Sequence, residues 1–175
     1  MINIFKKKFL FRPYPKVDLV LLDDNCSNLN FDFLKFKTIR SDEINLFHLV
    51  VAFYKFIFSF NNLKFKDVYF IEIINKLDPK IGLGCDVNWR IYKFVKYFSE
   101  KKSIIYQFGF YNFKYIEQFK KNILKFTNTK KIKCDYFFIW DKKFKDYFYY
   151  FNTNFIVNGS TRSNEIEKRK IKKKY

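Results

Sequence analysis

Five short apolar runs, each followed by small or polar residues, form the clearest pattern along the chain. Runs that are apolar at consecutive positions suit strands of a parallel sheet that are buried on both faces. The five runs cover residues 16–24, 79–86, 103–109, 134–140 and 154–160. Because an open parallel sheet binds its ligands at the carboxyl ends of its strands, the polar residues that close these runs are the first candidates for function.

Segments with helical periodicity separate the runs. Their apolar residues recur every three or four positions, which is the spacing of one buried helix face. The expected helices are one that begins at 41–43, then 64–77, 88–99, 112–126 and a short one over 141–150, and 33–39 adds a strand. This alternation predicts right-handed crossovers, so we expect an α/β fold: a Rossmann-like, doubly wound, mostly parallel sheet flanked by helices on both faces.

The most apolar segment is INLFHLVVAFYKFIFSF, at 44–60. It is shorter than the roughly 20 residues of a membrane-spanning helix, and His48 and Lys55 interrupt it. We therefore expect a core helix with its acidic start at Ser41–Glu43, and a histidine that is buried or partly exposed rather than catalytic. The predicted buried face consists of Leu46, Leu49, Val50, Phe53 and Ile57.

Length and charge narrow the organisation and the partners. The 175 residues fit one domain, which we place at 16–164, between a basic, frayed N-terminal segment (1–15) and a basic, disordered tail (165–175). The formal net charge is +18, but the cations are mostly Lys and accompany abundant Phe, Tyr, Ile and Asn, all of which AT-rich codons favour. Nucleic acid is therefore a less favoured partner, and the N-terminal segment offers a weak peripheral contact with an anionic membrane.

Cysteines and carboxylates exclude some classes of site. Cys26, Cys85 and Cys134 are too widely spaced for a zinc knuckle, and their odd number argues against a disulfide scaffold. A reducing, cytoplasmic compartment is expected. Asp23 and Asp24 could hold a cation, but adjacent carboxylates on a strand point in opposite directions, so a turn explains them better. We predict no metal site.

Three strand ends carry the candidate chemistry. At the first, Asp86 and Asn88 could take a substrate hydroxyl, with Asp86 as general base, although helix capping explains them more simply. At the second, Gln107 offers an amide and Gly109 a close approach to a ligand, or the two form an ordinary turn. The third corner combines a glycine, hydroxyls and an arginine, which suits an anion or a plain turn. Its candidate binding residues are Gly159, Ser160, Arg162 and Asn164.

The order of these sequence segments resembles that in a known protein family. The run INKLDPKIGLGCDVNWRIYKFVKYFSEKKSIIYQFG resembles the part of bacterial surface carbohydrate biosynthesis proteins in which one strand ends in Asp-Asn and the next in Gln-Asn-Gly. CDYFFIWDKKFKDYFYYFNTNFIVNGSTRSN resembles their later segment that closes on Gly-Ser and Asn, and TIRSDEINL is similar to their helix entry. In this chain Val87 lies between Asp86 and Asn88, where the family has adjacent Asp-Asn, and Phe108 stands in place of the Asn in the family's Gln-Asn-Gly. The likeness extends over about 16–164.

The resemblance implies a function. These proteins are similar to CDP-glycerol glycerophosphotransferases and other GT-B-like glycosyltransferases, which assemble cell-surface polysaccharide. The chain would be the N-terminal, acceptor-side half, with a carbohydrate or lipid-linked acceptor, no cofactor of its own, and a nucleotide-activated donor only when a second transferase domain or chain completes it. It would work in the cytoplasm, at the inner face of the membrane. Glu43 becomes a further catalytic candidate, and the other matched positions are Asn45, Asp86, Asn88, Gln107, Gly109, Gly159, Ser160 and Asn164.

Two alternatives from other classes remain open. A basic RNA-associated protein of ribosomal type would present a continuous lysine face with exposed Tyr and Phe. A non-catalytic domain that assembles with a partner would leave a large apolar face uncovered.

Overall fold

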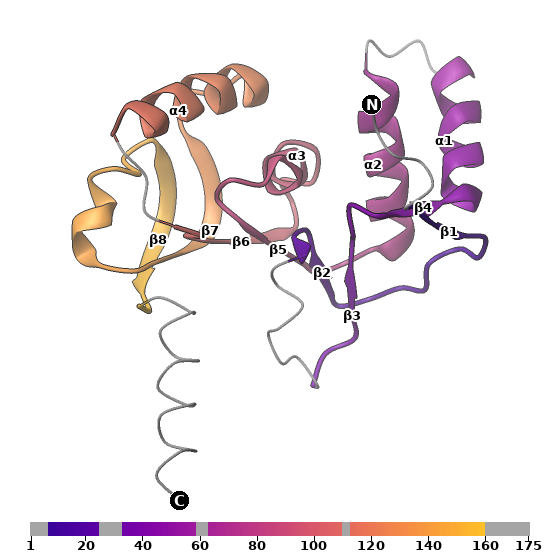
Figure 1. Ribbon diagram of the computed structural model, residues 1–175, viewed down its shortest axis with the longest axis horizontal. Helices are drawn as coiled ribbons and strands as arrows, with labels where there is room; N and C mark the ends of the chain where they lie inside the picture. Colours follow the sequence, from indigo (N-terminus) through magenta and orange to yellow (C-terminus); the bar gives the residue numbers. More distant parts are fainter. Residues whose placement is uncertain (1–6, 25–32, 59–62, 110–112, 160–175) are drawn as a thin grey trace, which may run out of the picture.

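A six-stranded parallel sheet forms the centre of the protein. The computed structural model describes residues 7–24, 33–58, 63–109 and 113–159. The strands are β2 (Leu19–Leu21), β3 (Phe36–Thr38), β5 (Ile81–Cys85), β6 (Lys102–Tyr106), β7 (Ile132–Ile139) and β8 (Phe151–Val157). They lie in the order β3-β2-β5-β6-β7-β8, and every neighbouring pair is parallel (Figure 1). The predicted Rossmann-like α/β fold is confirmed.

The helices flank this sheet. They are α1 (Leu46–Phe58), α2 (Phe65–Leu77), α3 (Trp89–Tyr97) and α4 (Phe113–Thr127), with a short 3-10 helix, η3 (Lys142–Lys145). In Figure 1, α3 and α4 lie above the sheet, and α2 stands between the sheet and the outermost helix, α1. The expected helix over 141–150 is only this 3-10 turn, but its acidic start is real, because the Asp141 side chain accepts from Lys143 N at 2.9 Å.

The main core lies between the sheet and helices α2, α3 and α4. Its largest fully buried side chains include Tyr92, Phe94 and Phe137. Gly82 in β5 explains how α3 comes so close, since a Cβ at that position would lie 2.6 Å from Cε1 of Phe94. A second, smaller cluster centres on Leu19, Leu21 and Leu83.

Burial varies along the sheet. All three residues of β2 are buried, and so are four of the five in β5, as the sequence predicts. In β6, however, Ser103 and Ile105 are buried whereas Ile104 and Tyr106 are half-buried, and β7 also alternates. The apolar runs therefore correspond to strands buried on both faces only at β2 and β5.

The structure adds two strands that the sequence pattern missed. β1 (Lys8–Leu10) and β4 (Glu43–Asn45) pair as a separate two-stranded parallel sheet. β1 belongs to the segment that we expected to fray. β4 takes residues that we expected to begin the helix, so α1 starts at Leu46 and Glu43 lies in a strand. Strands of three residues are too short to show alternation.

The predicted buried face of α1 is wrong for three of its residues. Val50, Phe53 and Ile57 are 68, 56 and 57% exposed, and the side chains that the helix buries are His48 and Ala52. His48 is buried because it has partners: Tyr14 N donates to Nε2 at 3.1 Å, and Nδ1 lies 3.5 Å from Oε1 of Glu72 in α2. Among the described residues, no helix has the length and apolar character needed to cross a membrane.

Candidate functional site

The strand order creates a topological switch point between β2 and β5. The chain leaves β2 for β3 on one side and later returns to β5 on the other side. Open parallel sheets bind ligands outside the carboxyl ends of the strands at such a point. Asp23 follows β2 and Asp86 follows β5, so the two carboxylates flank this point, and they are only 4% and 2% exposed.

Asp86 connects the end of β5 to the loop that follows β6. Its Oδ1 accepts a hydrogen bond from Phe108 N at 3.0 Å, and its own N–H donates to the carbonyl oxygen of Tyr106 at 3.0 Å. The hydroxyl of Tyr92 donates to the Asp86 carbonyl oxygen at 2.5 Å. The carboxylate thus fixes the position of the 107–109 loop.

Asn88 begins α3. Its Oδ1 accepts from Arg90 N at 2.9 Å, and its Nδ2 donates to the carbonyl oxygen of Leu22 at 2.9 Å. The predicted capping role is therefore confirmed for Asn88, which also fastens α3 to the end of β2.

Gln107 joins the ends of β6 and β7. Its Oε1 accepts from Trp140 N at 3.0 Å, and its Nε2 donates to the Gly109 carbonyl oxygen at 3.0 Å. The indole N–H of Trp140 donates in return to the Gln107 carbonyl oxygen at 3.0 Å. Gln107 is buried, so its side chain shapes the same loop that Asp86 holds.

Asp23 is a site residue that sequence reasoning assigned to a turn. The Tyr106 hydroxyl donates to its Oδ2 at 3.2 Å. Burial, together with the hydrogen bond to Asp23, raises the pKa of the Cys85 thiol, which therefore stays protonated and is a poor nucleophile at neutral pH. An acidic residue just beyond a fully buried apolar run was the available signal.

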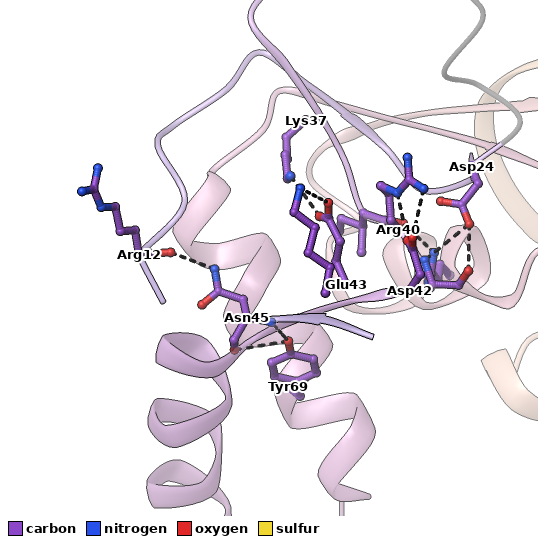
Figure 2. A network of polar contacts seen from close by, with 12 residues as sticks. Arg12, Asp24, Lys37, Arg40, Asp42, Glu43, Asn45 and Tyr69 are labelled. Carbon is purple, nitrogen blue, oxygen red and sulfur yellow. Dashed lines mark hydrogen bonds and ion pairs between the residues drawn. The ribbon is translucent and has the colours of Figure 1, made fainter. Parts of the chain in front are cut away.

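The side chain of the neighbouring Asp24 contacts different residues. Its Oδ2 accepts from Ser41 Oγ at 2.9 Å (Figure 2). The two carboxylates thus diverge, as predicted. Within the described part of the chain, no cluster of three or more His, Cys, Asp and Glu residues could hold a metal ion.

Glu43 belongs to a different polar network, at the base of α1. Its Oε2 lies 3.2 Å from Lys37 Nζ, and its Oε1 lies 3.9 Å from Lys8 Nζ. The adjacent Asn45 donates from Nδ2 to the Arg12 carbonyl oxygen at 2.8 Å, and its N–H donates to the Tyr69 hydroxyl at 2.9 Å (Figure 2). These contacts hold β4 in place. The carboxylate of Glu43 therefore pairs with lysines beside β4 and not with Asp86.

The third predicted corner is only partly described. Gly159 lies just beyond β8 with φ +66°, a conformation that favours glycine, and Asn158 N–H donates to the Ile139 carbonyl oxygen at 3.0 Å beside the end of β7. Ser160, Arg162 and Asn164 lie outside the described residues, as does Cys26.

Comparison with known proteins gives no match: no family model, no curated protein and no solved structure is significantly similar to this chain. The switch point brings together two buried carboxylates, Asp23 and Asp86, and the hydroxyl of Tyr106, which donates to Asp23. Groups of these types exchange hydrogen bonds with the hydroxyl groups of a ligand. His48 is not part of a catalytic triad, because its ring, on the buried side of α1, contacts Tyr14 N and Glu72.

Proposed function

We propose that this chain is a glycosyltransferase-like domain in cell-surface polysaccharide assembly, the N-terminal, acceptor-side half of a GT-B-type enzyme. The observation that supports it most is the pair Asp23 and Asp86 on either side of the β2/β5 switch point. Carboxylates in this position suit the binding of sugar hydroxyls. A phosphate-binding site would instead favour backbone N–H groups and arginine side chains at this position.

In this proposal a carbohydrate or lipid-linked acceptor lies on the carboxyl edge of the sheet. Its hydroxyl oxygen attacks the anomeric carbon of the donor sugar and forms the new glycosidic bond. The bond from that carbon to the phosphate oxygen breaks, the nucleotide phosphate leaves, and Asp86 takes the hydroxyl proton. The nucleotide-activated donor is held by a second domain or chain. Gln107 and Gly109 act by shaping the loop beside the acceptor. Glu43 takes no part in this step, because its carboxylate is paired with Lys37 and Lys8.

Acceptor binding can be tested with this chain alone. Saturation-transfer NMR with soluble alkyl glycosides of glucose, galactose and N-acetylglucosamine should show transfer to at least one sugar ring. Asp23→Asn should weaken that signal, whereas Asp146→Asn, an exposed carboxylate beyond η3, is the matched control. No binding of any glycoside, or equal loss in both variants, would overturn the acceptor site.

The base role of Asp86 has a sharper test. Asp86→Asn keeps an oxygen that can accept from Phe108 N–H, so the loop is preserved, but it cannot take up a proton. Once a partner domain supplies the donor, Asp86→Asn should retain acceptor binding and lose transfer. Asp86→Ala should lose both, because it also releases the loop. Full transfer by Asp86→Asn would exclude Asp86 as the base.

One observation favours RNA association as a second candidate. A groove of about 430 Å³ lies at the amino ends of β6 and β7, and its lining includes Lys96, Lys101, Lys102, Lys131 and Lys133. Two of these cations already have partners: Lys101 lies 2.9 Å from Asp78 Oδ1, and Lys96 donates to the Phe126 carbonyl oxygen. Salt-dependent binding of single-stranded RNA that Lys102→Glu/Lys131→Glu abolishes would move the function to this groove.

A further inference from the structure

Among the described residues, the outward face of α1 is apolar and largely exposed. Only at one margin does it meet α2, where the rings of Phe53 and Phe56 lie 6.3 and 5.6 Å from the ring of Phe65. Seven large apolar side chains on this helix of 13 residues are exposed. They are Phe47, Val50, Phe53, Tyr54, Phe56, Ile57 and Phe58. A helix that packed only as part of a core would hide these residues, because their burial contributes about 1.5–3 kcal/mol each.

The position of α1 leaves this face accessible. In Figure 1, α1 is the outermost helix, and α2 separates it from the main sheet. Its one charged residue, Lys55, points back to α2, where Nζ lies 2.5 Å from Oε2 of Glu72. The Lys55 side chain is still 53% exposed, so the outward surface of α1 combines apolar side chains with a single cation that is paired to α2.

Cations lie at both ends of the helix. Lys8 in β1 and the exposed Arg12 lie near its start, because β1 pairs with β4, which leads directly into α1. Lys64 and Lys66, both exposed, precede and begin α2, which follows the end of α1. Phe11, which is 72% exposed, extends the apolar surface beside Arg12.

We propose that α1 is a membrane-docking helix that lies in the plane of an anionic phospholipid bilayer, with its apolar face among the acyl chains and the flanking cations on the headgroups. Thirteen residues make a helix of about 20 Å, which is too short to cross a hydrocarbon core of about 30 Å but suits an interfacial orientation.

Charge distinguishes the bilayer from a second copy of this chain. Each copy carries a net charge of +18, so two copies repel each other, whereas an anionic surface attracts the chain. The acidic groups near α1 are already paired: Glu43 with Lys37, Glu72 with Lys55 and Asp42 with Arg40. The exposed face also offers few of the hydrogen-bonding groups that protein interfaces use. This inference does not depend on the proposed transferase activity.

Vesicle flotation of the full-length chain tests the proposal. Phosphatidylcholine vesicles that contain phosphatidylglycerol should carry the protein upward, pure phosphatidylcholine vesicles should carry much less, and high salt should weaken binding. Val50→Glu/Ile57→Glu should lower the partition coefficient at least about tenfold. Ile156→Glu/Val157→Glu, which puts the same charge on exposed residues of β8, is the matched control and should bind nearly as well as the wild type.

Thermal unfolding of both double variants establishes that each is folded before binding is compared. Equal loss of binding in the two variants would overturn the proposal, because net charge alone would then explain it. Binding to neither kind of vesicle would also overturn it. A light-scattering mass that falls from dimer to monomer in Val50→Glu/Ile57→Glu would assign the face to a second copy instead.

Discussion

Helices α1 and α3 begin in the same way and end up in opposite environments. Each starts after an asparagine whose Oδ1 accepts a backbone N–H of the first turn: Asn45 from His48 N at 3.2 Å, and Asn88 from Arg90 N at 2.9 Å. Each asparagine also donates from Nδ2 to a distant carbonyl, of Arg12 and Leu22 respectively. The local start of the two helices is thus nearly equivalent.

Their apolar faces are not equivalent. α3 buries Ile91, Tyr92 and Phe94 against the sheet, whereas α1 exposes most of its large apolar residues and buries His48 and Ala52. The more apolar helix is therefore the less buried one. The difference teaches that helical periodicity marks a face that needs a partner, but that partner can lie outside the domain.

The largest expected difference is in core packing. Phe94→Ala should lower the free energy of unfolding by about 3–5 kcal/mol, because it leaves a cavity beneath α3. Val50→Ala in α1 should change it by less than about 0.5 kcal/mol, since that side chain is 68% exposed. Urea unfolding of both variants measures the contrast, and similar losses would mean that α1 is as much a part of the core as α3.

Close packing under α3 provides the second test. Gly82→Ala places a methyl group 2.6 Å from the Phe94 ring, so we expect a loss of about 1–3 kcal/mol. Combining it with Phe94→Leu should cost less than the sum of the two single changes, because the smaller side chain makes room. Strict additivity in the double-mutant cycle would argue that the two residues do not touch.

The two capping asparagines sharpen the comparison further. Asn88→Ala should destabilise the whole domain by about 1–2 kcal/mol, since it removes a cap and a bond to β2. Asn45→Ala should chiefly increase hydrogen exchange within α1, a peripheral helix that can open locally. Exchange mass spectrometry separates the two effects, and a global change in both variants would contradict the separation.

The smallest effect concerns His48, the buried histidine of α1. Burial lowers the pKa of His48 below its ordinary value near 6.5, and Glu72 opposes this only in part. The unfolded chain therefore binds more protons than the native state as the pH falls below about 6.5, so stability decreases there until the lowered pKa is passed. One group can contribute at most about 1.4 kcal/mol per pH unit. His48→Gln should flatten the slope between neutral and mildly acid pH, and an unchanged slope would refute the assignment.

The fold was largely predictable, because the strands and helices around β5 and α3 carry strong periodicity and turn signals. Asn88 was also identifiable as a cap. By contrast, the three-residue strands β1 and β4 have no pattern to detect, and their pairing depends on contacts across more than 30 residues, such as Asn45 with Arg12.

The candidate site was predictable in place but not in detail. A run of apolar residues that ends in Asp86 or Gln107 locates the carboxyl edge. It does not reveal that the Asp86 carboxylate accepts from Phe108 N–H, nor that Gln107 bridges to Trp140, because those partners come from neighbouring strands. The place of Asp23 beside the switch point follows only from the strand order, in which β2 lies next to β5.

That strand order also constrains how the chain can fold as it is synthesised. β2 is an inner strand whose neighbours are β3 and β5, and residue 85 must be made before β5 is complete. Until then one edge of β2, with its unpaired backbone groups and three apolar side chains, is open to other chains. Closure over so long a separation in sequence is slow. The nascent chain therefore passes through a period in which this open strand edge favours aggregation.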